Sequence, residues 1–105
     1  MADEQLEADL RDLIALLDTY NEEHWSRWFG TSLRHIEAGD GYGLQHLLGA
    51  YGGMGSFNDL VIHPANGHPI DPRDVDAVNN QQRALGAAVW SRASALLREF
   101  RSDPA

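Results

Sequence analysis

The chain has 105 residues, of which 43% are hydrophobic, and it contains no cysteine. This size and composition fit one globular domain over residues 1–105, and they exclude an intrinsically disordered chain, a disulfide framework and a thiolate metal site. The formal net charge of −8 argues against nucleic acid as a direct ligand, because phosphate binding requires a basic surface.

The N-terminus is acidic and polar, and the apolar runs are only a few residues long. The sequence therefore predicts neither a signal peptide nor a transmembrane helix. The lack of cysteine favours an intracellular protein. All the basic side chains are arginines, and together with frequent alanine and glycine this is typical of a GC-rich bacterial genome. We expect a cytoplasmic bacterial protein that does not bind a membrane.

The first segment, from about Asp3 to Tyr20, has its apolar residues at the spacing of one helix face. It also carries most of the charge, because residues 1–23 hold eight acids and one arginine. A second helix is expected to begin at Glu22 or Glu23 with Asn21 as its cap. The apolar face of that helix comprises Trp25, Trp28, Phe29, Leu33 and Ile36.

Residues 38–41 predict a turn, and a short third helix is expected to follow and to end at Gly52-Gly53. Residues 52–70 are unsuited to a helix. Asn66-Gly67 is a hairpin signal, whereas the two nearby prolines restrict strand pairing to an edge. We expect either a long glycine-rich loop or a small β-hairpin in this region.

Asp71 as a cap and Pro72 as a first helical residue predict the start of a long C-terminal helix. Its apolar stripe continues from Val75 to Phe100, and Gln82 is the polar member of that stripe. We expect the Gln82 amide to hydrogen-bond a backbone carbonyl of the preceding loop. The predicted fold is mostly α, a compact four-helix domain with a long glycine-rich loop or small β-hairpin before a long C-terminal helix.

Metal-binding and catalytic signatures are weak. Asp59, His63, His68 and Asp71 are suitable ligand types for a divalent metal, but their spacing matches no signature. The remaining histidines, at positions 24, 35 and 46, are each eleven residues apart, and the turn at residues 38–41 is expected to prevent one helix face from holding all three. We predict no catalytic residue, no cofactor and no metal ion, and we favour a non-enzymatic function.

The most distinctive string is GGMGSFNDL at residues 52–60, where glycines permit tight turns that polar side chains can lock. With Asn79 and Asn80 in the following helix, this string resembles a family of short bacterial proteins of uncharacterised function. That resemblance implies no catalytic residue. In size and acidity the chain is also similar in general character to immunity proteins, which neutralise toxins.

The acidic first segment and the neighbouring aromatic residues favour a protein-binding module. Its most specific form would be an immunity-type inhibitor of a basic bacterial toxin such as a nuclease, because an acidic surface attracts a basic partner. The residues expected to contact that partner are Glu4, Glu7, Asp18, Glu22, Glu23 and Asp59.

Two alternatives remain open at this point. A small ligand- or metal-binding protein or enzyme would have its site between the 52–70 loop and the last helix, lined by Asn58, Asp59, His63, His68 and Gln82. A homodimeric regulatory protein would instead complete its core by pairing the long last helix with a second copy.

Overall fold

The computed structural model describes residues 3–102 and shows a mostly α domain. Its helices are α1 (Glu4–Thr19), α2 (Glu23–Glu37), α3 (Tyr42–Leu48) and α4 (Val75–Ser102). Three 3-10 turns, η1 (Phe57–Asp59), η2 (Pro64–Asn66) and η3 (Pro72–Asp74), lie between α3 and α4. The predicted four-helix fold with a long loop is confirmed, and the β-hairpin alternative is wrong because residues 3–102 contain no strand.

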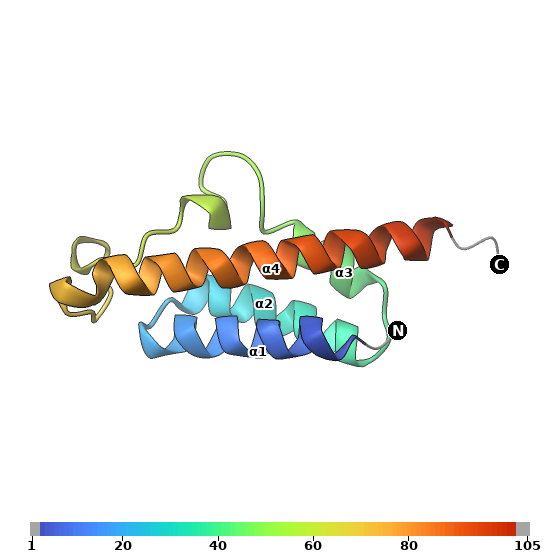
Figure 1. Cartoon of the computed structure of the whole chain (residues 1–105), viewed down its shortest axis with the longest axis horizontal. Coiled ribbons are helices and arrows are strands. Elements are labelled where there is room, and N and C mark those ends of the chain that lie inside the picture. Colours follow the sequence, from blue (N-terminus) through green and yellow to red (C-terminus); the bar gives the residue numbers. More distant parts are fainter. Residues whose placement is uncertain (1–2, 103–105) are drawn as a thin grey trace.

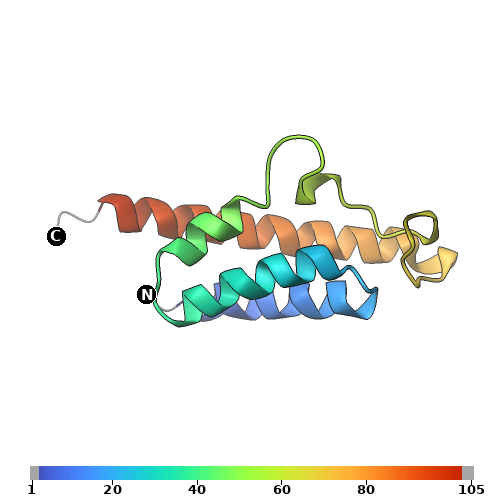
Figure 2. The ribbon, with the colours of Figure 1, turned by 180° about the vertical axis from the view of Figure 1, so that it is seen from behind.

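The helices pack in a ring, with α1 against α2, α2 against α3, α3 against α4, and α4 against α1. Helix α4 runs along the long axis of the molecule and extends past the antiparallel pair α1 and α2 at both ends (Figure 1). From behind, α3 lies against the C-terminal half of α4, and the following loop arches away from it (Figure 2). No helix in the described part of the chain has the length and hydropathy to cross a membrane.

The core follows the expected helix faces at most positions. Helix α1 buries Leu6, Leu10, Leu13 and Leu17, as expected, and also Leu16, whereas Ile14 of the expected face is only partly buried. On α4 the predicted stripe is correct at Val78, Gln82, Val89 and Ala93, which are all buried. It is wrong at its end, where Leu97 is buried and Phe100 is 57% exposed. Two successive steps of four residues, from Val89 to Ala93 and from Ala93 to Leu97, place the inner face at Leu97, one residue past the predicted Leu96.

Two helix boundaries differ from the prediction. Asn21 has a left-handed φ of 57° and reverses the chain between α1 and α2. Glu22 is the cap instead, and its carboxylate accepts a hydrogen bond from the Trp25 backbone N–H at 3.2 Å. Helix α3 ends at Leu48 rather than at the glycine pair. Tyr51 thereby leaves the helix, and its hydroxyl donates to the Gly86 carbonyl at 2.7 Å.

The start of α4 also differs in detail. Asp71 caps the 3-10 turn η3, where its carboxylate accepts from the Arg73 backbone N–H at 2.9 Å. Pro72 takes the first position of that turn, as expected, and the α-helix itself begins at Val75. The predicted capping chemistry is therefore correct, but it acts one turn before the regular helix.

Side-chain amides on α4 hold the irregular chain that precedes it. The Asn79 Oδ1 atom accepts from the Ile62 N–H, and its Nδ2 atom donates to the Ile62 carbonyl, both at 2.8 Å. Gln82 Nε2 donates to the Leu60 carbonyl at 2.9 Å, which confirms the role predicted for Gln82. Asn79 thus gives Ile62 the paired hydrogen bonds that a neighbouring strand would otherwise supply.

We expect the substitution Asn79→Ala to destabilise the fold by about 2–4 kcal/mol, because it leaves the buried N–H and carbonyl of Ile62 without partners. Asn80→Ala is the matched control, since Asn80 is the next residue of the same helix and is exposed. It should change stability by less than about 0.5 kcal/mol. Urea unfolding followed by circular dichroism measures both, and equal effects would contradict the anchoring role of Asn79.

Candidate functional site

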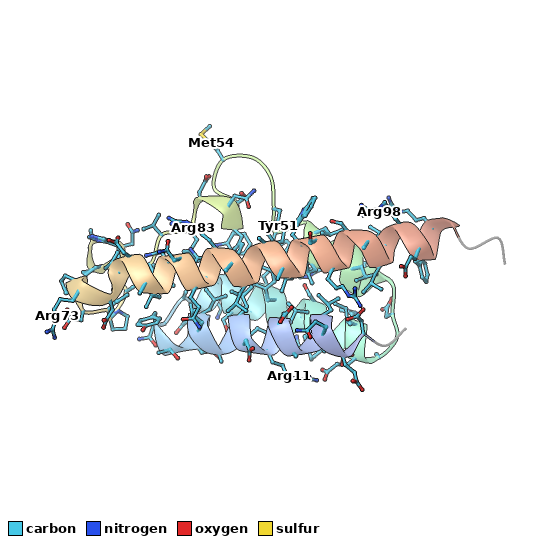
Figure 3. The ribbon with its side chains drawn as sticks, in the orientation of Figure 1. Arg11, Tyr51, Met54, Arg73, Arg83 and Arg98 are labelled. Carbon is cyan, nitrogen blue, oxygen red and sulfur yellow. The ribbon has the colours of Figure 1, made fainter. Side chains whose placement is uncertain are left out.

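A groove of about 640 Å³ lies between the chain that follows α3 and the middle of α4. Tyr51, Phe57 and Asn58 line it from the loop side, and Gln82, Arg83, Gly86 and Trp90 line it from α4. Figure 3 shows Tyr51 and Arg83 on the side of α4 that carries the loop, whose tip bears Met54. The volume lies within the roughly 300–1,000 Å³ typical of small-ligand sites.

The floor of the groove is held rigidly by aromatic packing. Phe57 is 4% exposed, and its ring makes edge contacts with the rings of Trp25, Phe29 and Tyr51 at centroid distances of 5.8, 4.9 and 5.6 Å. Burial raises the pKa of Tyr51, so its hydroxyl stays a hydrogen-bond donor to the Gly86 carbonyl. These contacts fix the loop wall against α4.

Gly86 allows this close approach. A Cβ atom at position 86 would lie 2.7 Å from Cε2 of Phe57, and the surrounding rings prevent Phe57 from moving away. We expect Gly86→Ala to destabilise the fold by about 1–3 kcal/mol through overpacking, despite the better helix propensity of alanine.

The control is Gly30→Ala in α2, where the nearest atom to a new Cβ is 4.0 Å away. This variant should gain up to about 1 kcal/mol from propensity. Thermal unfolding of the two variants beside the parent protein gives the comparison. If both variants gained stability, the Phe57 ring would have to move to make room for the new methyl group, which would contradict the overpacking expected at position 86.

The rim of the groove carries polar and apolar side chains with no internal role. Arg83 is exposed and makes no hydrogen bond or ion pair with any described residue. Trp90 is 47% exposed. Neither residue was predicted as part of a site. The available signal was that Trp90, a large aromatic residue, falls off the apolar stripe of α4.

The residues predicted for a ligand site do not all meet in this groove. Asn58 and Gln82 line it. Asp59, His63 and His68 do not, because each serves the loop backbone. The Asp59 carboxylate accepts from the Gly55 N–H at 2.7 Å, and His63 Nδ1 accepts from the Ala65 N–H at 2.9 Å.

His68 links the loop to the start of α2. It is 8% exposed, and its Nδ1 atom accepts from the His63 backbone N–H at 3.0 Å. The ring hydrogen must then be on Nε2, which donates to Glu22 Oε1 at 3.1 Å. Glu22 therefore caps α2 with one carboxylate oxygen and holds His68 with the other.

The six predicted partner-binding acids do not form one surface. Four have internal partners: Glu7 pairs with Arg11 at 3.6 Å, Asp18 accepts from the Ser26 hydroxyl, Glu22 holds His68, and Asp59 holds the Gly55 N–H.

The other two acids, Glu4 and Glu23, are exposed and have no partner among the described residues. Because α1 and α2 are antiparallel, these two lie at opposite ends of the helix pair. Asp12, midway along α1, is also exposed and without an internal partner among residues 3–102, and it was not predicted.

The three evenly spaced histidines belong to one chain of ring contacts. The turn after α2 breaks the single helix face, as expected, but it returns α3 onto α2, so that His46 stacks on Trp28 at a centroid distance of 4.3 Å. Trp28 also contacts His24, and Tyr42 connects His46 to His35. Within residues 3–102, no cluster of three or more histidine and acidic side chains is placed to hold a metal ion.

The structure alters the titration of His46. Desolvation lowers its pKa below the ordinary value of 6.5, and the charge of nearby His35 lowers it further. The neutral ring is therefore favoured by folding, so the stability present above pH 6.5 should be lost as the pH falls through the folded-state pKa.

NMR titration of the His46 ring should accordingly give a midpoint below 6.5. His35→Gln should move that midpoint upward, because it removes the repelling charge. His63→Gln, in the distant loop, should leave it unchanged. A His46 midpoint at or above 6.5 in the parent protein would contradict the burial of this ring.

Comparison with known proteins decides the family. Residues 18–71 match the family model described as "Domain of unknown function (DUF6966)", which covers more than half of the chain. The chain belongs to this family. No curated protein and no solved structure shows a significant match. The predicted membership of a family of uncharacterised function is thus confirmed, while the glycine-rich motif and the immunity-like character stay predictions.

The DUF6966 segment contains α2, α3 and the loop, and it therefore includes Phe57 and the histidine ring contacts. It leaves out nearly all of α1 and the whole of α4. The groove is consequently built half from the family segment and half from the helix that follows it.

Proposed function

We propose that the chain is a non-enzymatic protein-binding module that inhibits a basic protein, in the way that an immunity protein inhibits a bacterial toxin such as a nuclease. The observation that carries this proposal is the exposure of Glu4, Asp12 and Glu23 without partners among the described residues. These carboxylates are available for an external cation at no cost to the fold.

The charge distribution supports a basic partner. Residues 3–37 hold nine acids against three arginines, whereas residues 38–105 hold seven acids against five arginines. Ion pairs neutralise only part of the excess negative charge of residues 3–37. Arg92 of α4 binds the buried Asp3 at 2.8 Å, and Arg11 binds Glu37 at 2.6 Å. The negative potential over α1 and α2 would raise the rate at which a basic partner associates.

One serine and histidine pair has the spacing of a nucleophile and its base, but its surroundings give it a structural role. Ser32 Oγ lies 2.8 Å from His46 Nδ1. Ser32 is fully buried, however, and its hydroxyl donates to the Trp28 carbonyl at 3.1 Å. The serine oxygen is therefore closed to a substrate, and the pair serves to join α2 to α3.

Reversing the three exposed acids tests the proposal. The variant with Glu4→Arg, Asp12→Arg and Glu23→Arg should associate with its partner more slowly by about tenfold or more at low ionic strength, because steering is lost. The partners to test are the basic proteins encoded beside its gene. Stopped-flow measurement of association at low and high ionic strength gives the rate, and residual toxin activity gives the inhibition.

The matched control reverses Asp74, Asp76 and Glu99, three exposed acids at the other end of the sequence. It changes the net charge by the same amount and should leave the association rate close to that of the parent. Equal slowing in both variants would mean that only net charge matters. Absence of binding to every basic neighbour would overturn the proposal.

A further inference from the structure

The groove contains a fixed hydrogen-bond acceptor that the fold does not use. Gln82 is 1% exposed and lines the groove. Its Nε2 atom donates to the Leu60 carbonyl and, at a longer 3.4 Å, to Asn79 Oδ1, so these two acceptors determine which end of the amide faces them. Its Oε1 atom accepts no hydrogen bond from any described residue.

That oxygen reaches the surface through a small area, because the whole of Gln82 is only 1% exposed. Every fully buried side-chain nitrogen or oxygen in the described part of the chain has a partner, so Oε1, which has none, touches solvent. The groove is the surface that Gln82 lines. Gln82 therefore presents an immobile acceptor to a donor that enters the groove, and its amide is already held in place by the loop.

Arg83, Ala87 and Trp90 follow one another along the groove side of α4, because steps of four and three residues stay on one helix face. Trp90 is seven positions after Arg83, which is about 10 Å along the helix axis. At one end the groove therefore has an exposed guanidinium with no partner among residues 3–102. At the other end it has a half-exposed indole ring.

We infer that this groove binds a short extended peptide that carries an apolar side chain and, three residues later, a carboxylate. The apolar side chain would lie on Trp90, and a peptide N–H would donate to Gln82 Oε1. The carboxylate would pair with Arg83, whose planar guanidinium suits it. Three residues of extended chain span about 10 Å, which matches the spacing of Arg83 and Trp90.

The carboxylate could come from the C-terminus of the peptide or from an acidic side chain, and three synthetic peptides separate these sources. The first is acetyl-Phe-Ala-Ala-Ala with a free carboxylate, the second is its C-terminal amide, and the third is acetyl-Phe-Ala-Ala-Asp amide. Titration of isotope-labelled protein, observed by NMR, reports binding through the backbone signals of α4 and the indole N–H of Trp90.

The first peptide should shift the signals of Gln82, Arg83 and Trp90, and the neutral amide should bind up to about fivefold more weakly, since an exposed ion pair is worth only about 1 kcal/mol. Tight binding of the third peptide would identify an acidic side chain as an equally good source, and weak binding would restrict the site to a C-terminus. Equal affinities for the first two peptides, or shifts elsewhere in the protein, would overturn the inference.

Arg83→Gln should make the protein bind the charged and neutral peptides alike. Arg101→Gln, an exposed arginine near the end of the same helix, is the control and should preserve the discrimination. Trp90→Ala should weaken all three peptides. The inference is independent of the acidic surface, because the variant with Glu4, Asp12 and Glu23 reversed should still bind the peptides as the parent does.

Discussion

The paired hydrogen bonds between the Asn79 side chain and the Ile62 backbone are the interaction on which the irregular part of the structure depends. The chain between α3 and α4 has no strand partner, yet several of its backbone groups are buried and need hydrogen bonds. Asn79 satisfies two of them, and Gln82 and His68 satisfy their neighbours. Phe57 is held between these anchors and the Tyr51 hydroxyl bond, and together these contacts hold the wall of the groove against α4.

The same hydrogen-bonded framework connects the acidic start of α2 to the loop between α3 and α4. Glu22 caps α2 and holds His68, and His68 accepts the hydrogen bond of His63 in the loop. Glu22, which was expected to contact a partner, is therefore a structural residue. The surface left for a partner consists of carboxylates at separate points along α1 and α2, whereas the groove on the other side of α4 gathers its polar groups within two helical turns.

The sequence allowed the helices to be predicted because their evidence is local. The leucine spacing of α1 and the proline at the start of the last helical segment each act within a few residues. The role of Gln82 was predictable too, since a polar residue on an apolar stripe needs a partner. The pairing of Asn79 with Ile62, the contact of Phe57 with Gly86 and the engagement of Glu22 by His68 were not, because each joins residues far apart in the chain. The groove depends on those contacts, so only Asn58 and Gln82 of its lining were foreseen.

The side-chain amides that anchor the loop lie outside the segment matched by the family model. Similarity ends at residue 71, but the amides that satisfy Leu60 and Ile62 are at positions 79 and 82. The leucines that cover α2 come mostly from α1, before the segment begins. A boundary drawn by sequence similarity is therefore not a folding boundary here. Any relative that keeps this loop must supply equivalent amides from a helix outside the shared segment, and a fragment limited to residues 18–71 would lack the groups that give its loop a defined shape.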